Sequence, residues 1–408
     1  MTKYGRSPWL DAFPKSRVPS YPRHRGDMQI DAVVIGGGLT GCTTAYAFAA
    51  AGVKVLLLEA DQIGRGVTAF ASGWIAQEPG LSFADLEKAV GLRGARYGWQ
   101  VWRRAALDFI SLIRRLDIRC HLEERGSAVV AATPEQAARL KRDQKSRREA
   151  GLDASIMNAR AIKADLGLDA SAAIRSRHGA TIDPYRACVG LAAAATDRGA
   201  ALFERSPVRK ITFNRKTATV MTATGRIRTN RVVVATGMPT PLFKALARHF
   251  WFHTTYAVET EPLPAKIRQQ VGVGRDDSRA VVRDSAQPPH IIRWVEDDRL
   301  MVSGADSAAA PRQRDKIIVQ RTGQLMYELS TLYPEISGIR PDYGWAADYA
   351  RTAEGLPYIG PHRNYPHHLF AFGDSSRSVT GAYLASRLFL RHHSGELDRG
   401  DDVFGFHR

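Results

Sequence analysis

The 408-residue chain contains only three cysteines, Cys42, Cys120 and Cys188, and they lie far apart. Their spacing excludes a disulfide framework and fits no metal-binding pattern, so we expect reduced thiols and no metal site. A further consequence concerns cofactors. Because no cysteine follows Cys188, a cofactor cannot be attached covalently through a cysteine near the C-terminus.

The sequence also has no stretch that predicts a transmembrane helix or a signal peptide. Residues 32–53 carry almost no charge, but they contain five glycines and a glycine-rich turn, which favours the core of a nucleotide-binding fold. Residues 1–29 are rich in Pro, Arg and Tyr and have no apolar signal core. We therefore expect a cytoplasmic protein with no membrane span.

Lysine is scarce although the chain is basic: the formal net charge is +17, and most of the 58 basic residues are Arg. The arginines are scattered between Ala-rich stretches, which is typical of compositional bias. One dense cluster, at residues 139–148, falls on a predicted helix at 134–150, and such a cluster is more often a solvated face than a docking site. The charge therefore does not lead us to expect a nucleic-acid partner.

A complete dinucleotide-binding unit spans residues 31–59. The apolar strand Asp31–Ile35 leads into Gly36-Gly37-Gly38-Leu39-Thr40-Gly41, a helix follows, and the strand Val53–Leu58 ends at Glu59. Gly36 permits the turn, Gly38 admits the pyrophosphate, and Gly41 allows the helix to pack against the strand. Glu59 accepts hydrogen bonds from ribose hydroxyls and disfavours a 2′-phosphate, so FAD or NAD is expected.

The remaining pattern predicts an α/β protein with a discontinuous Rossmann-like FAD-binding domain and an α+β substrate domain on a mostly antiparallel sheet. The predicted divisions are a leader at 1–28, a first FAD-binding part at 29–82, a helical and substrate-domain insertion at 83–150, a second FAD-binding part at 151–243, the substrate-domain sheet at 244–335, and a final FAD-binding part at 336–408. Among the residues predicted to lie in this sheet are Val258–Thr260, Ile291–Val295 and Leu300–Gly304.

Three distant segments favour FAD over NAD. They are the strand end at residues 232–237, the Gly373-Asp374 turn, and the small-residue loop at 63–74. With the first motif they resemble the FAD-dependent D-amino acid oxidase–like superfamily, and particularly its branch of glycine, sarcosine and γ-glutamylputrescine oxidases. The predicted cofactor contacts are Gly36, Gly38, Leu39, Thr40, Gly41, Glu59, Ala60, Gly66, Val67, Thr68, Ser72, Gly73, Val208, Ala235, Thr236, Gly237, Gly373 and Asp374.

The resemblance covers nearly the whole chain. The leader Pro8-Trp9-Leu10, the helix start Asp183-Pro184, the segment Glu259–Leu263 and the segment Leu356–Gly360 each resemble a motif of that branch. The chain departs from the branch after Ala69, where Phe70-Ala71-Ser72-Gly73 replaces the usual Arg-Asn-Gly-Gly. It departs again near the C-terminus, where Ser376 and Ser378 replace glycines and Arg377 stands where His is common.

The resemblance implies oxidation of a C–N bond by hydride transfer to flavin N5, giving an imine that hydrolyses. Arg293 is the predicted ligand of a substrate carboxylate, although it could equally be a surface cation. His253 and Tyr256 are predicted to cap the amine pocket, and Arg377 to face the flavin. Each has a structural alternative: His253 as an ordinary buried histidine and Arg377 as a surface residue before a helix.

The predicted partners are a small amine or amino acid, with an anionic amine favoured by the charge, and an electron acceptor. Relatives that react well with O₂ often place a Lys over the flavin. No Lys occurs between Lys266 and Lys316 in this chain, so we expect slow turnover with O₂. A quinone or other electron-transfer partner therefore stands beside O₂ as a predicted electron acceptor. The FAD is expected to be non-covalent. Two other functions remain open: an FAD-binding subunit or RNA-modifying flavoenzyme of the same fold, and an NAD-linked dehydrogenase.

Overall fold

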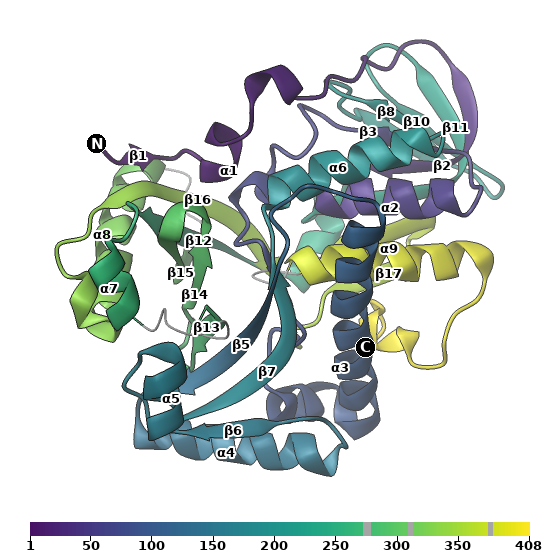
Figure 1. Cartoon of the computed structure of the whole chain (residues 1–408). Helices are drawn as coiled ribbons and strands as arrows, with labels where there is room; N and C mark the ends of the chain where they lie inside the picture. Colours follow the sequence, from purple (N-terminus) through teal and green to yellow (C-terminus); the bar gives the residue numbers. More distant parts are fainter. Residues whose placement is uncertain (272–278, 309–312, 374–377) are drawn as a thin grey trace.

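The computed structural model describes residues 1–271, 279–308, 313–373 and 378–408. Two large sheets dominate it (Figure 1). The eight-stranded sheet lies beneath the helices α2 and α6, and the ten-stranded sheet lies on the other side of the molecule. No helix in these described ranges is long and apolar enough to cross a membrane.

The eight-stranded sheet is parallel at its centre, in the order β17-β18-β11-β2-β3-β8. β11 pairs in parallel with β2 and β18, and β2 pairs in parallel with β3. β9 and β10 extend one end of β11 as an antiparallel meander. Its strands are β2 (Met28–Ile35), β3 (Val55–Leu58), β8 (Ala201–Phe203), β9 (Lys210–Phe213), β10 (Ala218–Met221), β11 (Arg226–Gly237), β17 (Tyr358–His362) and β18 (Tyr365–Phe372).

Three helices pack together on one face of this sheet: α2 (Leu39–Ala50), α6 (Pro184–Asp197) and α9 (Ser378–Ser394). A long helix, α3 (Phe83–Arg115), contacts α9 from outside. The core between them contains Phe48, Trp102, Phe109 and Phe389, all of which are fully buried. α2 is buried on nearly every side, as expected for a helix between a sheet and two other helices.

The ten-stranded sheet is mixed but mostly antiparallel, in the order β1-β16-β12-β15-β14-β13-β5-β7-β4, with β6 paired to β7. Only the pairs β1–β16 and β13–β5 are parallel among the pairings described. Its strands are β1 (Lys3–Tyr4), β4 (Trp74–Ile75), β5 (Glu123–Ala131), β6 (Ser155–Asn158), β7 (Ala172–Thr181), β12 (Trp251–Thr260), β13 (Val281–Asp284), β14 (Ile291–Val295), β15 (Arg299–Ala308) and β16 (Pro341–Arg351).

Helices cover this second sheet in two groups. α8 (Arg314–Leu332) packs across β12, β15 and β16, with the short α7 (Ala265–Gln270) beside it. α4 (Pro134–Glu149) and α5 (Ala159–Leu166) lie against β5, β6 and β7 at the far end. A second core, including Leu325, Leu329 and Val258, fills the space under α8.

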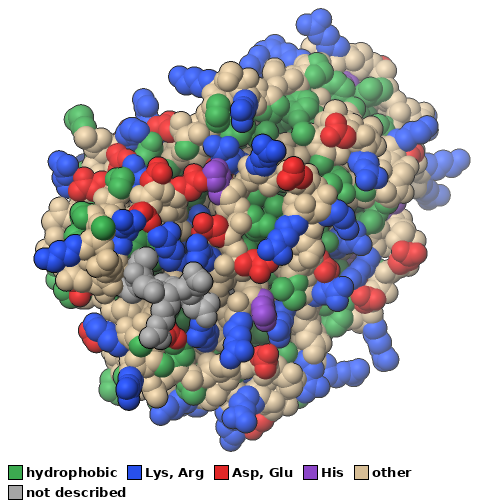
Figure 2. Space-filling view, viewed as in Figure 1, with side chains coloured by type: hydrophobic (Ala, Val, Ile, Leu, Met, Phe, Trp, Pro, Cys, Tyr) green, Lys and Arg blue, Asp and Glu red, His purple; other side chains and the backbone are tan. Residues whose placement is uncertain are grey.

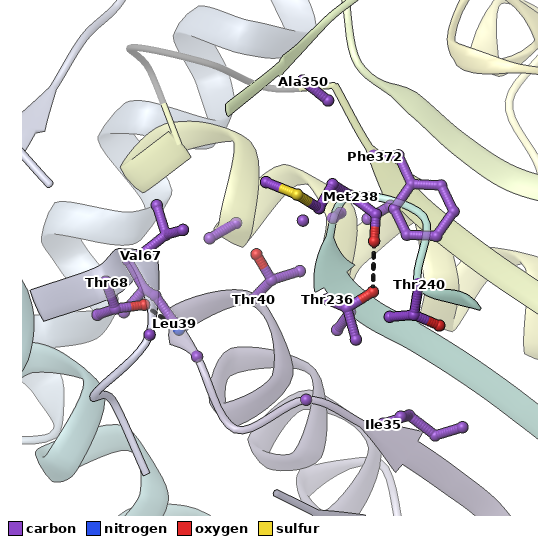
Figure 3. Close-up of a pocket in the computed structure, with 18 of the residues that line it drawn as sticks. Ile35, Leu39, Thr40, Val67, Thr68, Thr236, Met238, Thr240, Ala350 and Phe372 are labelled. Atoms are coloured by element: carbon purple, nitrogen blue, oxygen red, sulfur yellow. Dashed lines mark hydrogen bonds between the residues drawn. The ribbon is translucent and has the colours of Figure 1, made fainter. Parts of the chain in front are cut away.

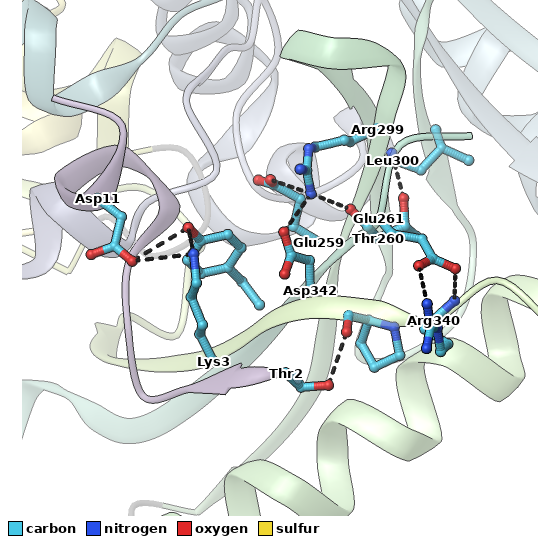
Figure 4. Close-up of polar contacts among 12 residues, drawn as sticks. Thr2, Lys3, Asp11, Glu259, Thr260, Glu261, Arg299, Leu300, Arg340 and Asp342 are labelled. Atoms are coloured by element: carbon cyan, nitrogen blue, oxygen red, sulfur yellow. Dashed lines mark hydrogen bonds and ion pairs between the residues drawn. The ribbon is translucent and has the colours of Figure 1, made fainter. Parts of the chain in front are cut away.

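The first residues of the chain are ordered and bridge the two halves, which differs from the irregular leader that the prolines predict. β1 pairs in parallel with β16, and α1 (Pro8–Asp11) follows, capped by the Ser7 side chain. Figure 4 shows Lys3 beside Asp11. Lys3 Nζ also donates to Tyr343 Oη at 2.6 Å. The same view shows Arg299 between Glu259 and Asp342.

The long strands β7 and β16 were not predicted from the sequence, and the predicted extent of one FAD-binding part needs correction. β7 and β6 belong to the ten-stranded sheet, so part of the segment 151–243 lies outside the cofactor-binding sheet to which it was assigned. β16 contains Pro, two Asp and a Gly, residues of low β propensity, and β12 stabilises it through pairing along its whole length.

Candidate active site

A cavity of about 530 Å³ opens at the carboxyl ends of β2, β3 and β11. Figure 3 shows Thr40, Val67 and Thr236 facing this space from three separate segments. Ala350 and Phe372 approach from the other sheet and from β18. The crevice outside the carboxyl ends of the strands is where ligands bind in open α/β sheets.

The first turn of α2 forms the anion-binding end of the cavity. Gly38 is the N-cap and offers no side chain to the free amides. Thr68 Oγ1 accepts the hydrogen bond of the Leu39 amide at 2.9 Å, which ties the following loop to the helix start. The remaining free amides and the positive end of the helix dipole lie where Gly38 and Thr40 line the cavity, which suits a pyrophosphate.

Glu59 lies at the end of β3 beside this helix start. One carboxylate oxygen accepts from the Gly37 amide at 2.6 Å and the other from the Asp61 amide at 2.8 Å. These two bonds fix the carboxylate, while its remaining lone pairs are free to accept from ribose hydroxyls. Since Glu59 also lines the cavity, its position fits the predicted ribose contact.

Gly36 and Gly41 act through close approach of backbone. A Cβ on Gly41 would lie 1.8 Å from the Gly36 carbonyl oxygen, so only glycine allows α2 to pack here. Gly36 has a φ of +107°, and a Cβ on it would meet the Ala235 carbonyl at 2.7 Å. Gly41 does not line the cavity; its role is to set the position of the helix.

Four consecutive carbonyls, at residues 69–72, are each bound by a side chain from another part of the chain. We call this segment the buttressed loop. Ser7 Oγ donates to the Ala69 carbonyl, and Trp345 Nε1 donates to the Phe70 carbonyl at 3.0 Å. The two remaining donors are Trp9 Nε1, at 3.1 Å from the Ala71 oxygen, and Arg293 Nη1, at 2.8 Å from the Ser72 oxygen. The loop is therefore held from behind by the leader and the ten-stranded sheet.

This arrangement corrects the predicted roles of Ser72 and Gly73. Neither lines the cavity, although Gly66, Val67, Thr68 and Ala71 do. Gly73 has a φ of +70°, and a Cβ there would lie 2.2 Å from the Ile182 carbonyl oxygen. Glycine at 73 is therefore required by the packing of the loop against the start of α6.

Arg293 lies behind the buttressed loop, which differs from both of its predicted roles. It is 4% exposed, its Nη1 also donates to the Ile182 carbonyl at 3.2 Å, and its guanidinium packs over the Trp9 ring. Burial lowers the pKa of Arg293 to about 10, with Glu259 acting in the opposite direction. Arg293 does not line the cavity and is not exposed to solvent. Its position therefore fits neither a substrate ligand nor a surface cation, and its hydrogen bond to the Ser72 carbonyl holds the loop.

The end of the ten-stranded sheet brings a polar cluster to the far side of the cavity. We call it the sheet-end cluster: His253 on β12, Asp306 on β15, and Tyr349 and Arg351 on β16. Tyr349 lines the cavity, and His253 stacks on its ring with centroids 5.9 Å apart. Arg351 pairs with Asp306, and His253 Nε2 lies 3.6 Å from the Asp306 carboxylate.

His253 is the least satisfied member of this cluster. It is 8% exposed, and neither ring nitrogen forms a hydrogen bond with any residue in the described ranges. Burial, followed by the charge of Arg351, lowers the pKa of His253 to about 4, against the opposing effect of Asp306. The ring is therefore neutral at neutral pH, and its buried nitrogens lie behind Tyr349, which lines the cavity in its place.

The other predicted substrate residues have different positions. Tyr256 lies on the opposite face of β12, in the core under α8, where its hydroxyl is 3.1 Å from Ser307 Oγ. It therefore does not join His253 in a common pocket. Asp374 and Arg377, predicted beside the flavin, lie outside the described residues.

The cavity also contains residues that the sequence did not single out. The segment after β11 contributes Met238, Thr240 and Leu242, and the β16 end contributes Asp348 and Ala350. α9 contributes Gly381, Ala382 and Ala385, which are small residues on one helical face. Their spacing was the one feature of the sequence that could have indicated a helix face lining the cavity. The predicted contacts that do line the cavity are Gly36, Gly38, Leu39, Thr40, Glu59, Ala60, Gly66, Val67, Thr68, Val208, Ala235, Thr236, Gly237 and Gly373.

Comparisons with known proteins agree with this site. Residues 31–391 match the DAO family model, described as FAD dependent oxidoreductase. The chain is 26% identical over 375 residues to γ-glutamylputrescine oxidoreductase of Escherichia coli K12, covering 91% of this chain and 85% of that protein. It is 24% identical over 403 residues to glycine oxidase of Bacillus subtilis 168, covering 91% and 98%. The solved structure of L-amino acid deaminase from Proteus myxofaciens matches with a TM-score of 0.76 at 17% identity, covering 96% of each chain.

Proposed function

We propose, from the premise that this chain belongs to the DAO family of FAD-dependent oxidoreductases, that it oxidises the C–N bond of an amine or amino acid. FAD is the cofactor, and the uncapped start of α2, Glu59 and the buttressed loop form a cavity that fits it. The observation that carries the proposal is the position of Tyr349, which lines the cavity on the side opposite the dinucleotide motif and is backed by the His253 ring.

The start of α2 and Glu59 would hold FAD, which would supply an acceptor for a hydride from the substrate carbon and a route for two electrons to an external acceptor. The substrate then loses a proton from nitrogen, so that its C–N bond becomes C=N, and water hydrolyses the imine to a carbonyl compound and ammonia or a smaller amine. No side chain has to form a bond with the substrate. The tasks left to the protein are to orient the C–H bond, to keep the amine neutral and to exclude water.

The sheet-end cluster suits the second of these tasks. A protonated amine has no lone pair on nitrogen to assist hydride loss. Burial and the nearby Arg351 charge disfavour a second cation, which is why the pKa of His253 falls to about 4. The same surroundings would lower the pKa of an amine bound beside Tyr349. The His253 ring packs on Tyr349 and so fixes the side chain that faces the cavity.

The relatives support an amine or amino acid as the substrate class, because one is named for γ-glutamylputrescine and another for glycine. We further propose that an acceptor other than O₂ takes the electrons. No Lys occurs between Lys266 and Lys316, the part of the chain that contains three strands of the ten-stranded sheet. We also expect acid or heat to release the flavin, because no cysteine follows Cys188.

The test is anaerobic bleaching of the flavin absorbance of purified protein by a panel of amines, amino acids and 2-hydroxy acids. Bleaching by an amine or amino acid supports the proposal, and slow recovery in air supports a non-O₂ acceptor. Bleaching by hydroxy acids alone would contradict it. A yellow protein that no compound bleaches would favour the alternative, an FAD-binding subunit or an RNA-modifying flavoenzyme.

A matched pair of variants links the activity to this cluster. His253→Leu removes the ring that packs on Tyr349 and should weaken amine binding about fivefold, the effect of about 1 kcal/mol from one lost aromatic contact. Tyr256→Phe, on the opposite face of the same strand, should bleach like the wild type. Equal behaviour of the two variants would remove His253 from the substrate site.

A further inference from the structure

A groove of about 1020 Å³ lies next to the cofactor cavity. Its walls are the start of α3, one face of α4, the β13–β14 turn and the turn after β16. Gly373 lines both the groove and the cavity, so the two spaces meet there. Arg351 of the sheet-end cluster also lines the groove. An occupant of the groove can therefore extend from the place where the amine would react.

Cations predominate on the walls of this groove, and they are also the commoner charged groups over the face shown in Figure 2. The basic residues that line it are Lys88, Arg139, Arg142, Lys145, Arg147, Arg283 and Arg351, against the acidic residues Asp85, Asp143, Glu149 and Asp284.

Internal pairs account for most of the acidic groups. Arg147 is buried and holds Asp143 and Glu78, each at 2.8 Å. Asp284 is bound by the His290 ring at 2.7 Å. Within the described residues, no carboxylate lies within ion-pair distance of Arg139, Arg142 or Arg283. The groove therefore has cationic groups that no carboxylate of the described residues neutralises.

Arg283 is the most informative of the three. It extends from β13, is half-buried, and the only hydrogen bond described for its guanidinium is from Nη2 to the Gly80 carbonyl at 3.2 Å. Burial lowers its pKa, and the nearby Glu78 carboxylate is already held by Arg147 and Ser176. Removing a charge from water without a partner costs free energy, so a guanidinium in this position indicates an anionic ligand.

We propose that the groove binds an anionic group of the substrate at a distance from the reacting C–N bond, and that the substrate class is an amine with a distal carboxylate or phosphate. Arg283 binds that anion, and Arg139 and Arg142 on α4 attract it. This inference rests on the proposed function, because it assigns the reacting amine to the sheet-end cluster. Arg suits both anions, because its fork of donors matches carboxylate and phosphate oxygens.

The first experiment measures anion binding to the FAD-loaded protein by calorimetric titration, without turnover. Butanoate is the carboxylate probe and propylphosphonate the phosphonate probe, and neither has an amine that could reduce the flavin. Arg283→Leu should weaken binding of the preferred probe ten- to a hundredfold, as expected for a lost charge-assisted contact. Arg148→Leu is the control, because Arg148 is exposed on α4 but does not line the groove. Whichever probe binds more tightly identifies carboxylate or phosphate as the natural group.

The second experiment compares flavin bleaching by 4-aminobutanoate, 3-aminopropylphosphonate and the neutral 4-aminobutanamide. The anionic amines should bleach at lower concentration than the amide in the wild type, and this advantage should disappear in Arg283→Leu. If that variant does not fold, the exposed pair Arg139→Ser and Arg142→Ser should reduce the same advantage and its sensitivity to salt.

The outcomes separate the two proposals. If neither probe binds the wild type, or if Arg283→Leu binds as well as Arg148→Leu, the groove is not an anion site. Bleaching by neutral amines would still support the proposed function in that case. If anion binding depends on Arg283 but no amine bleaches the flavin, the anion site in the groove would be supported. The proposed C–N oxidation would then be overturned.

Discussion

The buttressed loop, on the cofactor side, differs from the proposed substrate side, formed by the sheet-end cluster and the adjoining groove, in how its polar groups are satisfied. Each carbonyl from Ala69 to Ser72 receives a donor from within the chain. Across the cavity, the His253 ring forms no hydrogen bond with any described residue. The Arg283 guanidinium forms no ion pair with a described carboxylate. The cofactor side is thus complete before any ligand arrives, whereas the substrate side has groups that a ligand would satisfy. This is the difference expected between a resident cofactor and a substrate that must leave.

The largest expected effect is at Gly41. In Gly41→Ala the new Cβ would lie 1.8 Å from the Gly36 carbonyl, so α2 must move away from β2. Overpacking of this kind costs about 1–3 kcal/mol, and we expect both loss of FAD and a lower thermal midpoint. Gly323→Ala on α8 is the control, because no atom lies within 4 Å of its added Cβ. A variant at 41 that retains FAD at wild-type stability would show that the close approach is not required.

Arg293→Met tests whether the loop depends on its donors. The carbonyls of Ser72 and Ile182 lose their donor, at about 1–3 kcal/mol for each unsatisfied group, partly offset because a charge is no longer buried. We expect FAD to dissociate at least tenfold faster, with substrate affinity per bound FAD unchanged. Trp9→Phe, which removes one N–H and keeps a ring, should give a smaller change in the same direction. Weakened substrate binding at full FAD content would restore Arg293 to the substrate site.

Gly38→Ala separates cofactor binding from folding. Its added Cβ would meet only Thr68 Oγ1, at 3.1 Å, while the glycine itself lines the cavity. We therefore expect an unchanged thermal midpoint for the FAD-free protein and roughly tenfold weaker FAD binding, measured by fluorescence titration. A drop in the midpoint of the FAD-free protein equal to that of Gly41→Ala would mean that both glycines act through packing alone.

His253 should also make the stability of the protein depend on pH. Its pKa is about 4 in the folded protein and 6.5 when unperturbed, so the unfolded chain binds more protons between these values. Stability should therefore rise with pH across this interval and be lost as the pH falls from 6.5 towards 4. Urea unfolding at several pH values should show a flatter profile for His253→Gln than for the wild type. Replacing the exposed His407 with Gln should leave the profile unchanged.

The cofactor side could be predicted from the sequence because its chemistry is local. The strand, the glycines, the helix and Glu59 fall within one short segment, and the physical reason for each glycine follows from its place in the turn. That segment predicted FAD or NAD, and three distant segments were needed to favour FAD and to suggest the family. Of the predicted contacts, Gly41, Ser72 and Gly73 do not line the cavity. The environment of the last two depends on Arg293 and Ile182, more than 100 residues away along the chain.

The substrate side could not be predicted in the same way, because side chains from separate strands form it. His253, Asp306 and Arg351 come together only because β12 lies between β15 and β16, and β16 itself has a sequence of low strand propensity. Arg293 and Arg283 illustrate the consequence. Both lie on strands of the same sheet and are identical as residue types, yet one faces a backbone loop and the other a groove.

The pairing of the leader with β16 sets an order of events during synthesis. Lys3 contacts Tyr343, 340 residues later in the chain, and the donors Ser7 and Trp9 act on a loop that Trp345 also holds. At roughly 5–20 residues per second, translation of the intervening chain takes on the order of twenty seconds to a minute. During that time the dinucleotide motif at 31–59 has already been made, but the loop beside it has only part of its support. Secure retention of FAD is therefore expected to be a late event, which follows the emergence of β16 from the ribosome.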